Sequence, residues 1–257
     1  MPAPTVGRSC RNSTRYFDPP RRGRQPAIYG PQLEWSPMDA IETTDAMSLE
    51  AAYRESILHD FVTSERDFPW RHTSDAFAVL VGEVLLQRTR GENVEPVYRE
   101  LLRRWPTPQR LARAREATIE QVIRPLGLRK RSSVLHRLAV ELTKLEGVPS
   151  DPTALDKLPG VGPYAAHSVP VFAYGENLPM VDWVIARVLR RFFGLESGPR
   201  PNQDSNLWAL ATRLATVGKA RELWLGTLDL AAAVCKPRPR CGSCPLATHC
   251  LFAGAAA

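Results

Sequence analysis

Residues 153–169 of this chain read TALDKLPGVGPYAAHSV, and this stretch decides the fold. Apolar residues on both sides of the turn Leu158–Gly162 predict two short helices, and Pro163 can open the second because its missing N–H is not needed there. Glycine at 160 and 162 is expected to permit a positive φ and a close approach. The amides at the start of the second helix then form a phosphate site, although a Gly-x-Gly turn also occurs in ordinary helix connections.

The stretch downstream of this hairpin, residues 180–191, reads MVDWVIARVLRR and begins another helix. Asp182 stands at its N-cap, where a capping carboxylate is the ordinary interpretation. The order LPGVG, then VD, then RVxxR resembles the helix-hairpin-helix DNA glycosylases of the endonuclease III superfamily. In that family this aspartate is the catalytic carboxylate, so the resemblance implies that Asp182 faces the sugar of a nucleotide.

Two stretches upstream of the hairpin extend the resemblance, which covers roughly residues 67–250. Residues 68–71 (FPWR) and 82–89 (GEVLLQRT) resemble the N-terminal signature shared by adenine glycosylases and thymine/uracil mismatch glycosylases. The resemblance places Glu83 in the base pocket, and its apolar neighbours argue against an exposed helix glutamate. It also implies that the Gln-Arg-Thr segment probes the opened duplex. We expect DNA contacts from Gln87, Arg88, Gly160, Gly162 and Arg187.

Four of the five cysteines crowd near the end of the chain as Cys235-x5-Cys241-x2-Cys244-x5-Cys250. A disulfide framework is not expected to do this in a protein of 257 residues. Four soft thiolates in one loop suit a cubane cluster, and the loop resembles the cluster loop of the same superfamily, whose first spacing is usually one residue longer. We expect a [4Fe-4S] cluster on these four cysteines, with a closed zinc site as the alternative.

The cluster loop has two further expected roles. Residues 236–240 read KPRPR, a rigid cationic surface suited to phosphates. The cluster is also expected to hold the C-terminal helix near 223–234 against the segment 53–61, because we expect these two segments to share no extended hydrophobic core of their own.

Tyr164 bears on the reaction type. Bifunctional members of the superfamily carry a lysine at this position, where an amine attacks the sugar and the strand is then cut. Tyrosine cannot form a Schiff base, so we expect a monofunctional enzyme. Breaking an N-glycosidic bond builds positive charge on the sugar, which a carboxylate stabilises while a second group helps the base to leave. Asp182, Glu83 and Tyr164 are therefore the catalytic candidates.

The substrate expected from the resemblance is thymine or uracil opposite guanine. Tyr164, Glu83 and residues 218–226 (GKARELWLG) look more like the mismatch enzymes than the adenine enzymes. Adenine glycosylases usually append a further domain, and here the chain stops soon after Cys250. Adenine and a modified base remain alternative substrates. Val184 replaces a position that is often polar in relatives, and Pro170 interrupts the second hairpin helix, so either residue could reshape the pocket. A DNA-binding protein that carries a cluster but excises no base is therefore a further alternative.

Charge and hydropathy limit the partners. Lys and Arg number 34 against 27 Asp and Glu, which gives a formal net charge of +7. Such a surface suits double-stranded DNA, although a basic surface can also be unengaged. No apolar run of about 18 residues could span a bilayer, and no signal peptide follows Arg8 and Arg11. We expect a monomer in the cytoplasm, associated with the nucleoid.

The chain pattern gives the fold class. Residues 1–45 mix Pro, Arg, Gly and Ser with few aliphatic residues, which is typical of a disordered basic tail. Later apolar residues recur at helical spacing, as at 80–85 and 94–101, and nothing alternates for long with period two. We expect an all-α protein of about ten helices, in which residues 46–72 plus 184–257 form an iron–sulfur domain and residues 73–183 form a six-helix domain with the hairpin.

The cysteine pattern predicts a brown protein whose visible absorbance disappears when Cys241 or Cys244 is replaced by serine, because each supplies one of only four ligands. Absorbance spectra and iron analysis of the purified proteins measure this. Cys10→Ser, which lies outside the pattern, should keep the colour. A colourless wild-type protein that contains one zinc ion contradicts the prediction.

Overall fold

The computed structural model describes residues 43–61, 66–127, 129–196 and 198–255. The chain divides into two units, Met1–Ala40 and Ile41–Ala257, and the described residues all belong to the second. The predicted basic tail, residues 1–45, lies outside the described residues as far as position 42. The described part of the chain is helical and contains no strand, which confirms the all-α class.

Twelve α-helices occur in the described residues, more than the ten or so expected, because several are very short. Their bounds are α1 (Thr43–Asp60), α2 (Ala76–Leu86), α3 (Gly91–Arg104), α4 (Pro108–Ala112), α5 (Glu116–Ile123), α6 (Arg131–Lys144), α7 (Pro152–Leu155), α8 (Pro163–Val169), α9 (Trp183–Phe192), α10 (Ser205–Thr216), α11 (Ala220–Ala233) and α12 (Leu251–Ala255). Short helical turns add η1 (Pro69–Arg71), η2 (Arg124–Leu126), η3 (Pro170–Tyr174), η4 (Pro201–Gln203) and η5 (Cys241–Ser243).

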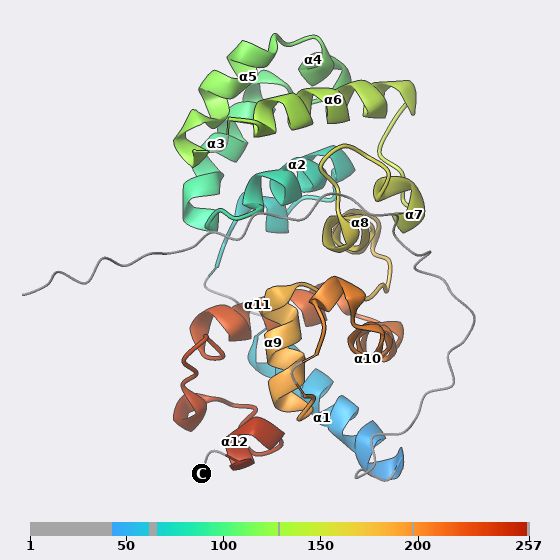
Figure 1. Cartoon of the computed structure of the whole chain (residues 1–257), viewed down its shortest axis with the longest axis vertical. Coiled ribbons are helices and arrows are strands. Elements are labelled where there is room, and N and C mark those ends of the chain that lie inside the picture. The colour runs from blue at the N-terminus through green and yellow to red at the C-terminus, as the bar shows by residue number, and fades with distance from the viewer. Residues whose placement is uncertain (1–42, 62–65, 128, 197, 256–257) are drawn as a thin grey trace, which may run out of the picture. The chain divides into compact units, whose positions relative to one another are not determined.

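Helices α2 to α8 form one group of mutually packed helices (Figure 1). α2 begins where Asp75 accepts hydrogen bonds from the N–H groups of Phe77 and Ala78, at 2.8 and 3.2 Å. The apolar positions expected on α2 and α3 are buried, including Leu80 and Leu101. α2 packs on α8, and α8 packs on α7, so the hairpin rests directly on α2.

Helices α1, α9, α10 and α11 form a second packed group (Figure 1). Tyr53 of α1 is fully buried and its hydroxyl lies 2.8 Å from the hydroxyl of Thr227 on α11. Gly226 lets α1 approach, because a Cβ there would stand only 2.7 Å from Cγ2 of Ile57. The expectation that these two segments lack a mutual core is therefore wrong. They pack on each other directly, without help from the cysteine loop.

The turn η3 joins the two groups. α8 ends at Val169, and Pro170 begins a π-helical turn that contacts both α2 and α11. Proline lacks the N–H that a continuing α-helix would use, so the backbone widens instead of keeping its regular bonds. The expected interruption at Pro170 is thus present, and it carries Phe172 toward the pocket described below.

The close approach at Gly226 predicts that Gly226→Ala lowers the free energy of unfolding by about 1 to 3 kcal/mol, because an added methyl group overpacks the α1–α11 contact. Urea denaturation followed by circular dichroism measures the loss. Gly254→Ala is the matched control, since a Cβ there meets nothing within 4 Å. Equal stability of the Gly226 variant and the wild type contradicts the packing described here.

Candidate active site

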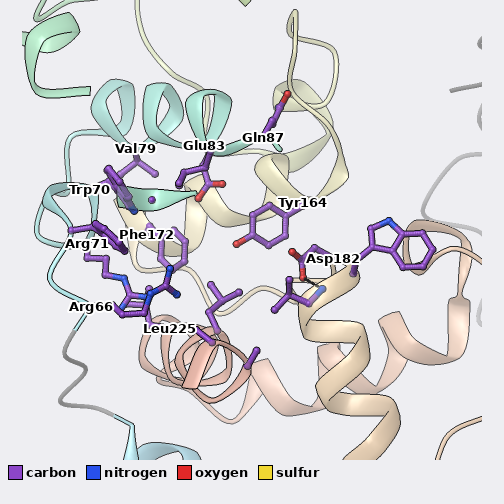
Figure 2. A pocket seen from close by; sticks show the side chains of 18 of the residues that line it. Arg66, Trp70, Arg71, Val79, Glu83, Gln87, Tyr164, Phe172, Asp182 and Leu225 are labelled. Carbon is purple, nitrogen blue, oxygen red and sulfur yellow. Dashed lines mark hydrogen bonds between the residues drawn. The ribbon is translucent and has the colours of Figure 1, made fainter. Parts of the chain in front are cut away.

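A cavity of about 700 Å³ opens where the two helical groups meet. Its lining comes from the segment 66–71 and from α2, α8, η3, α9 and α11. Figure 2 shows Glu83 entering from α2, Tyr164 from α8 and Asp182 from the start of α9. The three residues predicted to be catalytic thus line the same cavity, although they come from three different helices.

Glu83 reaches the cavity because α2 is apolar along almost its whole length. It is the one ionisable residue in the sequence AFAVLVGEVLL of that helix. The preceding Gly82 lies against Trp70, since a Cβ there would stand 3.2 Å from Cβ of Trp70. α2 is therefore held between the hairpin and the segment 68–71, and Glu83 is enclosed with it.

Burial changes the acidity of Glu83. Loss of solvent raises the pKa of this carboxyl from 4.5 to about 7. A hydrogen bond with Ser168, which is fully buried, opposes this rise in pKa, whereas the negative charge of Asp182 adds to it. Near neutral pH Glu83 therefore exchanges a proton readily, which is what a general acid or base needs.

Asp182 caps α9 and faces the cavity at the same time. Its Oδ1 accepts hydrogen bonds from the N–H groups of Val184 and Ile185, at 2.8 and 2.7 Å. Burial raises the pKa of Asp182, while these two N–H groups and the charge of Arg187 oppose the rise. The helix start thus favours the charged carboxylate at this position. The sequence left two interpretations of Asp182, a helix cap or a pocket residue. In the structure the same side chain does both.

Tyr164 projects between these two carboxyl groups (Figure 2). Burial raises the pKa of its phenol well above 10.0, and the charges of Glu83 and Asp182 raise it further. Tyr164 therefore remains a neutral phenol that can donate or accept a hydrogen bond. It offers no amine to the cavity.

The other side of the cavity is cationic. Arg71 forms two hydrogen bonds with the carboxylate of Asp229 on α11, at 2.8 and 2.7 Å. Arg66 lies 3.6 Å from the same carboxylate. Arg221 donates to the backbone carbonyls of Phe172 and Arg71. These contacts hold three guanidinium groups in place around the pocket.

Sequence reasoning missed four of these residues: Arg66, Ser168, Arg221 and Asp229. Asp229 carried a signal, because it stands between Leu228 and Leu230 in an apolar helix and a buried carboxylate needs a partner. Its partner Arg71 lies far away in the sequence. No local pattern could have paired the two.

The predicted DNA contacts at the end of α2 and the hairpin lie together. Nε2 of Gln87 donates to the carbonyl of Gly160 at 2.8 Å, and the exposed Arg88 follows with φ of 58°. Gly160 has φ of 79°, and a side chain there would overlap Val134. Gly162 differs from expectation, because its φ of −121° suits any residue. A Cβ at Gly162 meets no atom within 4 Å, so glycine leaves the start of α8 open.

Arg187 has a different position from the other predicted DNA contacts. It lines the cavity, and its Nε donates to the carbonyl of Cys235 at 3.0 Å. Arg191, one turn further along α9, donates to Sγ of Cys235 at 3.5 Å and to the carbonyl of Pro237 at 2.9 Å. α9 therefore connects the pocket at its start with the cysteine loop at its end.

The four cysteines of the C-terminal loop form no disulfide, and each is half-buried. Burial raises the pKa of Cys244, and the charges of Cys250, Cys235 and Cys241 raise it further, so the four sulfur atoms lie within electrostatic reach of one another. Among the described residues, no group of three or more His, Cys, Asp or Glu is arranged to hold a metal ion. The donor set itself, four thiols in one loop beside two arginines, fits an iron–sulfur cluster.

None of the helices in the described ranges is both long and apolar enough to cross a membrane.

Comparison with known proteins defines the class. A family model described as HhH-GPD superfamily base excision DNA repair protein matches residues 81–210. These residues include Glu83, the hairpin with Tyr164, and Asp182 at the start of α9. The chain belongs to the HhH-GPD superfamily of base excision DNA repair proteins, as its motifs predicted.

Within this superfamily the chain is similar to thymine and uracil glycosylases. A thymine/uracil-DNA glycosylase from Pyrobaculum aerophilum is 42% identical over 196 residues, which cover 73% of this chain and 85% of the relative. A thymine-DNA glycosylase from Aeropyrum pernix is 38% identical, with 81% and 96% covered. Among solved structures, a thermostable thymine-DNA glycosylase matches with a TM-score of 0.77 and 32% identity, over 82% of this chain and 99% of the other.

The raised pKa of Glu83 predicts a pH-dependent loss of stability. Below pH 4.5 the carboxyl is protonated in both the folded and the unfolded chain. As pH rises from 4.5 to about 7, the unfolded chain releases the proton first, so the folded state loses stability. Glu83→Gln, neutral at every pH, should gain about 3 kcal/mol over the wild type between pH 4.5 and pH 8. Urea denaturation across this range measures the gain, and parallel pH profiles contradict the prediction.

Proposed function

We propose that this protein is a monofunctional DNA glycosylase that hydrolyses the N-glycosidic bond of thymine or uracil opposite guanine in double-stranded DNA. The observation that carries the proposal is the meeting of Glu83, Tyr164 and Asp182 in one cavity at the junction of two helical groups. The names of the similar glycosylases support the choice of thymine and uracil. An enzyme of this kind can work as a monomer, because all three residues come from one chain.

The two carboxyl groups are suited to different roles. Departure of the base leaves positive charge on the sugar, and Asp182 can stabilise that charge and orient the attacking water. Glu83, with its pKa raised to about 7, is partly protonated at neutral pH and can give that proton to the departing base. The cavity of about 700 Å³ is large enough for a base taken out of the duplex.

The phenol of Tyr164 favours a reaction that leaves the DNA strand uncut. A Schiff base with the sugar requires an amine, and the residue at this place is a neutral phenol. Its hydroxyl can bind the flipped nucleotide by hydrogen bonding instead. We infer that the reaction ends with an intact strand that carries an abasic site.

DNA binding is assigned to two parts of the surface. The amides at the start of α8, which Gly162 leaves uncovered, can hold a phosphate of the backbone. Gln87 and Arg88 stand next to this turn and can enter the opened duplex. The formal net charge of +7 favours the approach of DNA. Arg187, which lines the cavity and donates a hydrogen bond to the carbonyl of Cys235, is the predicted DNA contact on the cavity wall.

Cys235, Cys241, Cys244 and Cys250 would hold a [4Fe-4S] cluster. A zinc ion on the same four thiols is the alternative, and iron and zinc analysis of the purified protein separates the two. When bound, the cluster would hold the C-terminal segment in place together with the basic residues Lys236, Arg238 and Arg240 of its loop. The predicted division into an iron–sulfur domain, 46–72 plus 184–257, and a domain at 73–183 would place the cavity between them.

The proposal predicts that Asp182→Asn lowers the single-turnover excision rate by roughly a hundredfold or more, because the charge that meets the transition state is gone. Asparagine still caps a helix, so folding and DNA affinity should change little. The measurement uses duplexes that contain T, U or A opposite G. Strand cleavage after alkali reports base excision, and strand cleavage before alkali reports cutting by the protein itself.

Asp151→Asn is the matched control, because Asp151 caps α7 in the same way but lies outside the cavity. Its excision rate should equal that of the wild type. Undiminished excision by Asp182→Asn refutes the assignment of the catalytic carboxylate. A wild type that binds these duplexes but releases no base points instead to a non-catalytic DNA-binding protein, and strand cleavage without alkali rules out the monofunctional reaction.

A further inference from the structure

Trp183 is the exposed tryptophan at the mouth of the cavity. The residue keeps 66% of its surface exposed, yet it belongs to the lining of the cavity. The other tryptophans in the described ranges behave differently, because Trp224 is fully buried and Trp70, Trp105 and Trp208 pack against the core. Trp183 has no aromatic or cation–π partner among the described residues.

The backbone position of Trp183 is fixed by the residue before it. Trp183 is the first residue of α9, directly after Asp182, whose carboxylate is bonded to the N–H groups of Val184 and Ile185. The cap therefore fixes the backbone of the tryptophan without using its ring. A large apolar ring on a rigid helix start, held in water at the edge of a pocket, is available for a flat partner.

The surroundings of the ring indicate which partner it meets. Exposed Arg88 and half-buried Arg187 also line this cavity, so an anionic strand is attracted to the same opening. On the proposed function, one nucleotide leaves the duplex to enter the cavity, and the bases that it leaves behind lose a stacking neighbour. An indole is a good replacement surface, because every base has a π-face.

We propose that Trp183 stacks on a nucleobase of the opened duplex beside the extruded nucleotide, and that it holds the extruded state in this way. This inference rests on the proposed glycosylase function and goes beyond it, since it assigns a positioning role to a residue outside the chemistry. The partner is a nucleobase, either one of the two neighbours in the same strand or the base left opposite.

Binding to a trapped duplex tests the proposal. The probe is 2′-fluoro-2′-deoxyuridine opposite guanine, whose glycosidic bond resists hydrolysis. Trp183→Ala should weaken its binding by roughly five- to a hundredfold, the range found when a stacking aromatic is removed. Trp183→Phe should restore most of the affinity. Leu145→Ala, which removes another exposed apolar side chain outside the cavity, should leave affinity unchanged.

A fluorescent base identifies the stacked partner. 2-Aminopurine is placed in turn 5′ to the target, 3′ to it, or opposite it. The wild type should quench its fluorescence at one of these positions, because the indole stacks on it there, and Trp183→Ala should not. Quenching that is equal in the wild type and Trp183→Ala at all three positions, with equal affinity, overturns the proposal.

These experiments distinguish a failure of the stacking proposal from a failure of the proposed glycosylase function. If the wild type excises bases and Trp183→Ala binds and excises equally well, only the stacking role fails. If the wild type releases no base but quenches 2-aminopurine through Trp183, the stacking role stands and the catalytic proposal fails. A wild type that does not bind any of the duplexes refutes both.

Discussion

The side chain of Asp182 has two positions to satisfy at once, the cap of α9 and the wall of the cavity, and the geometry of the site depends on it. Asp182 accepts the first free N–H groups of α9 and, from the same position, faces a cavity that contains Glu83. Two carboxyl groups in one cavity cannot both be charged without cost, so burial, and to a smaller extent the charge of Asp182, raise the pKa of Glu83 to about 7. Under the proposed function, this difference in acidity between Asp182 and Glu83 suits the two carboxyl groups to different chemical roles.

The cationic side of the cavity is fixed by neutralising contacts. Asp229 binds Arg71 through both carboxylate oxygens, and Arg221 is held by two backbone carbonyls. Guanidinium groups anchored in this way keep their charge near the cavity without moving to meet a ligand. Because Asp229 lies on α11 and Arg71 on the segment before α2, the same ion pair also holds the two helical groups together at the cavity. Pocket electrostatics and packing therefore depend on the same contacts.

Helix α9 connects the cavity with the cysteine loop. Asp182 and Trp183 stand at its start, whereas Arg187 and Arg191 bind the backbone and a sulfur atom of the loop from its later turns. A rigid helix transmits the position of one end to the other, so order in the cysteine loop supports the geometry of the cavity. This gives the loop a structural use that does not require electron transfer.

The sequence by itself determined what short-range chemistry controls: the cap at Asp182, the hairpin turn at Gly160, the helix opened by Pro163 and the grouping of four cysteines. Each rests on atoms a few residues apart, and its pattern is therefore legible in the chain. Only the tertiary structure decided that Asp229 pairs with Arg71, that Ser168 contacts Glu83, and that α1 packs on α11 through Gly226. It also decided that Gly162 needs no positive φ. These outcomes depend on burial and on contacts between distant segments, which exist only once the helices have packed.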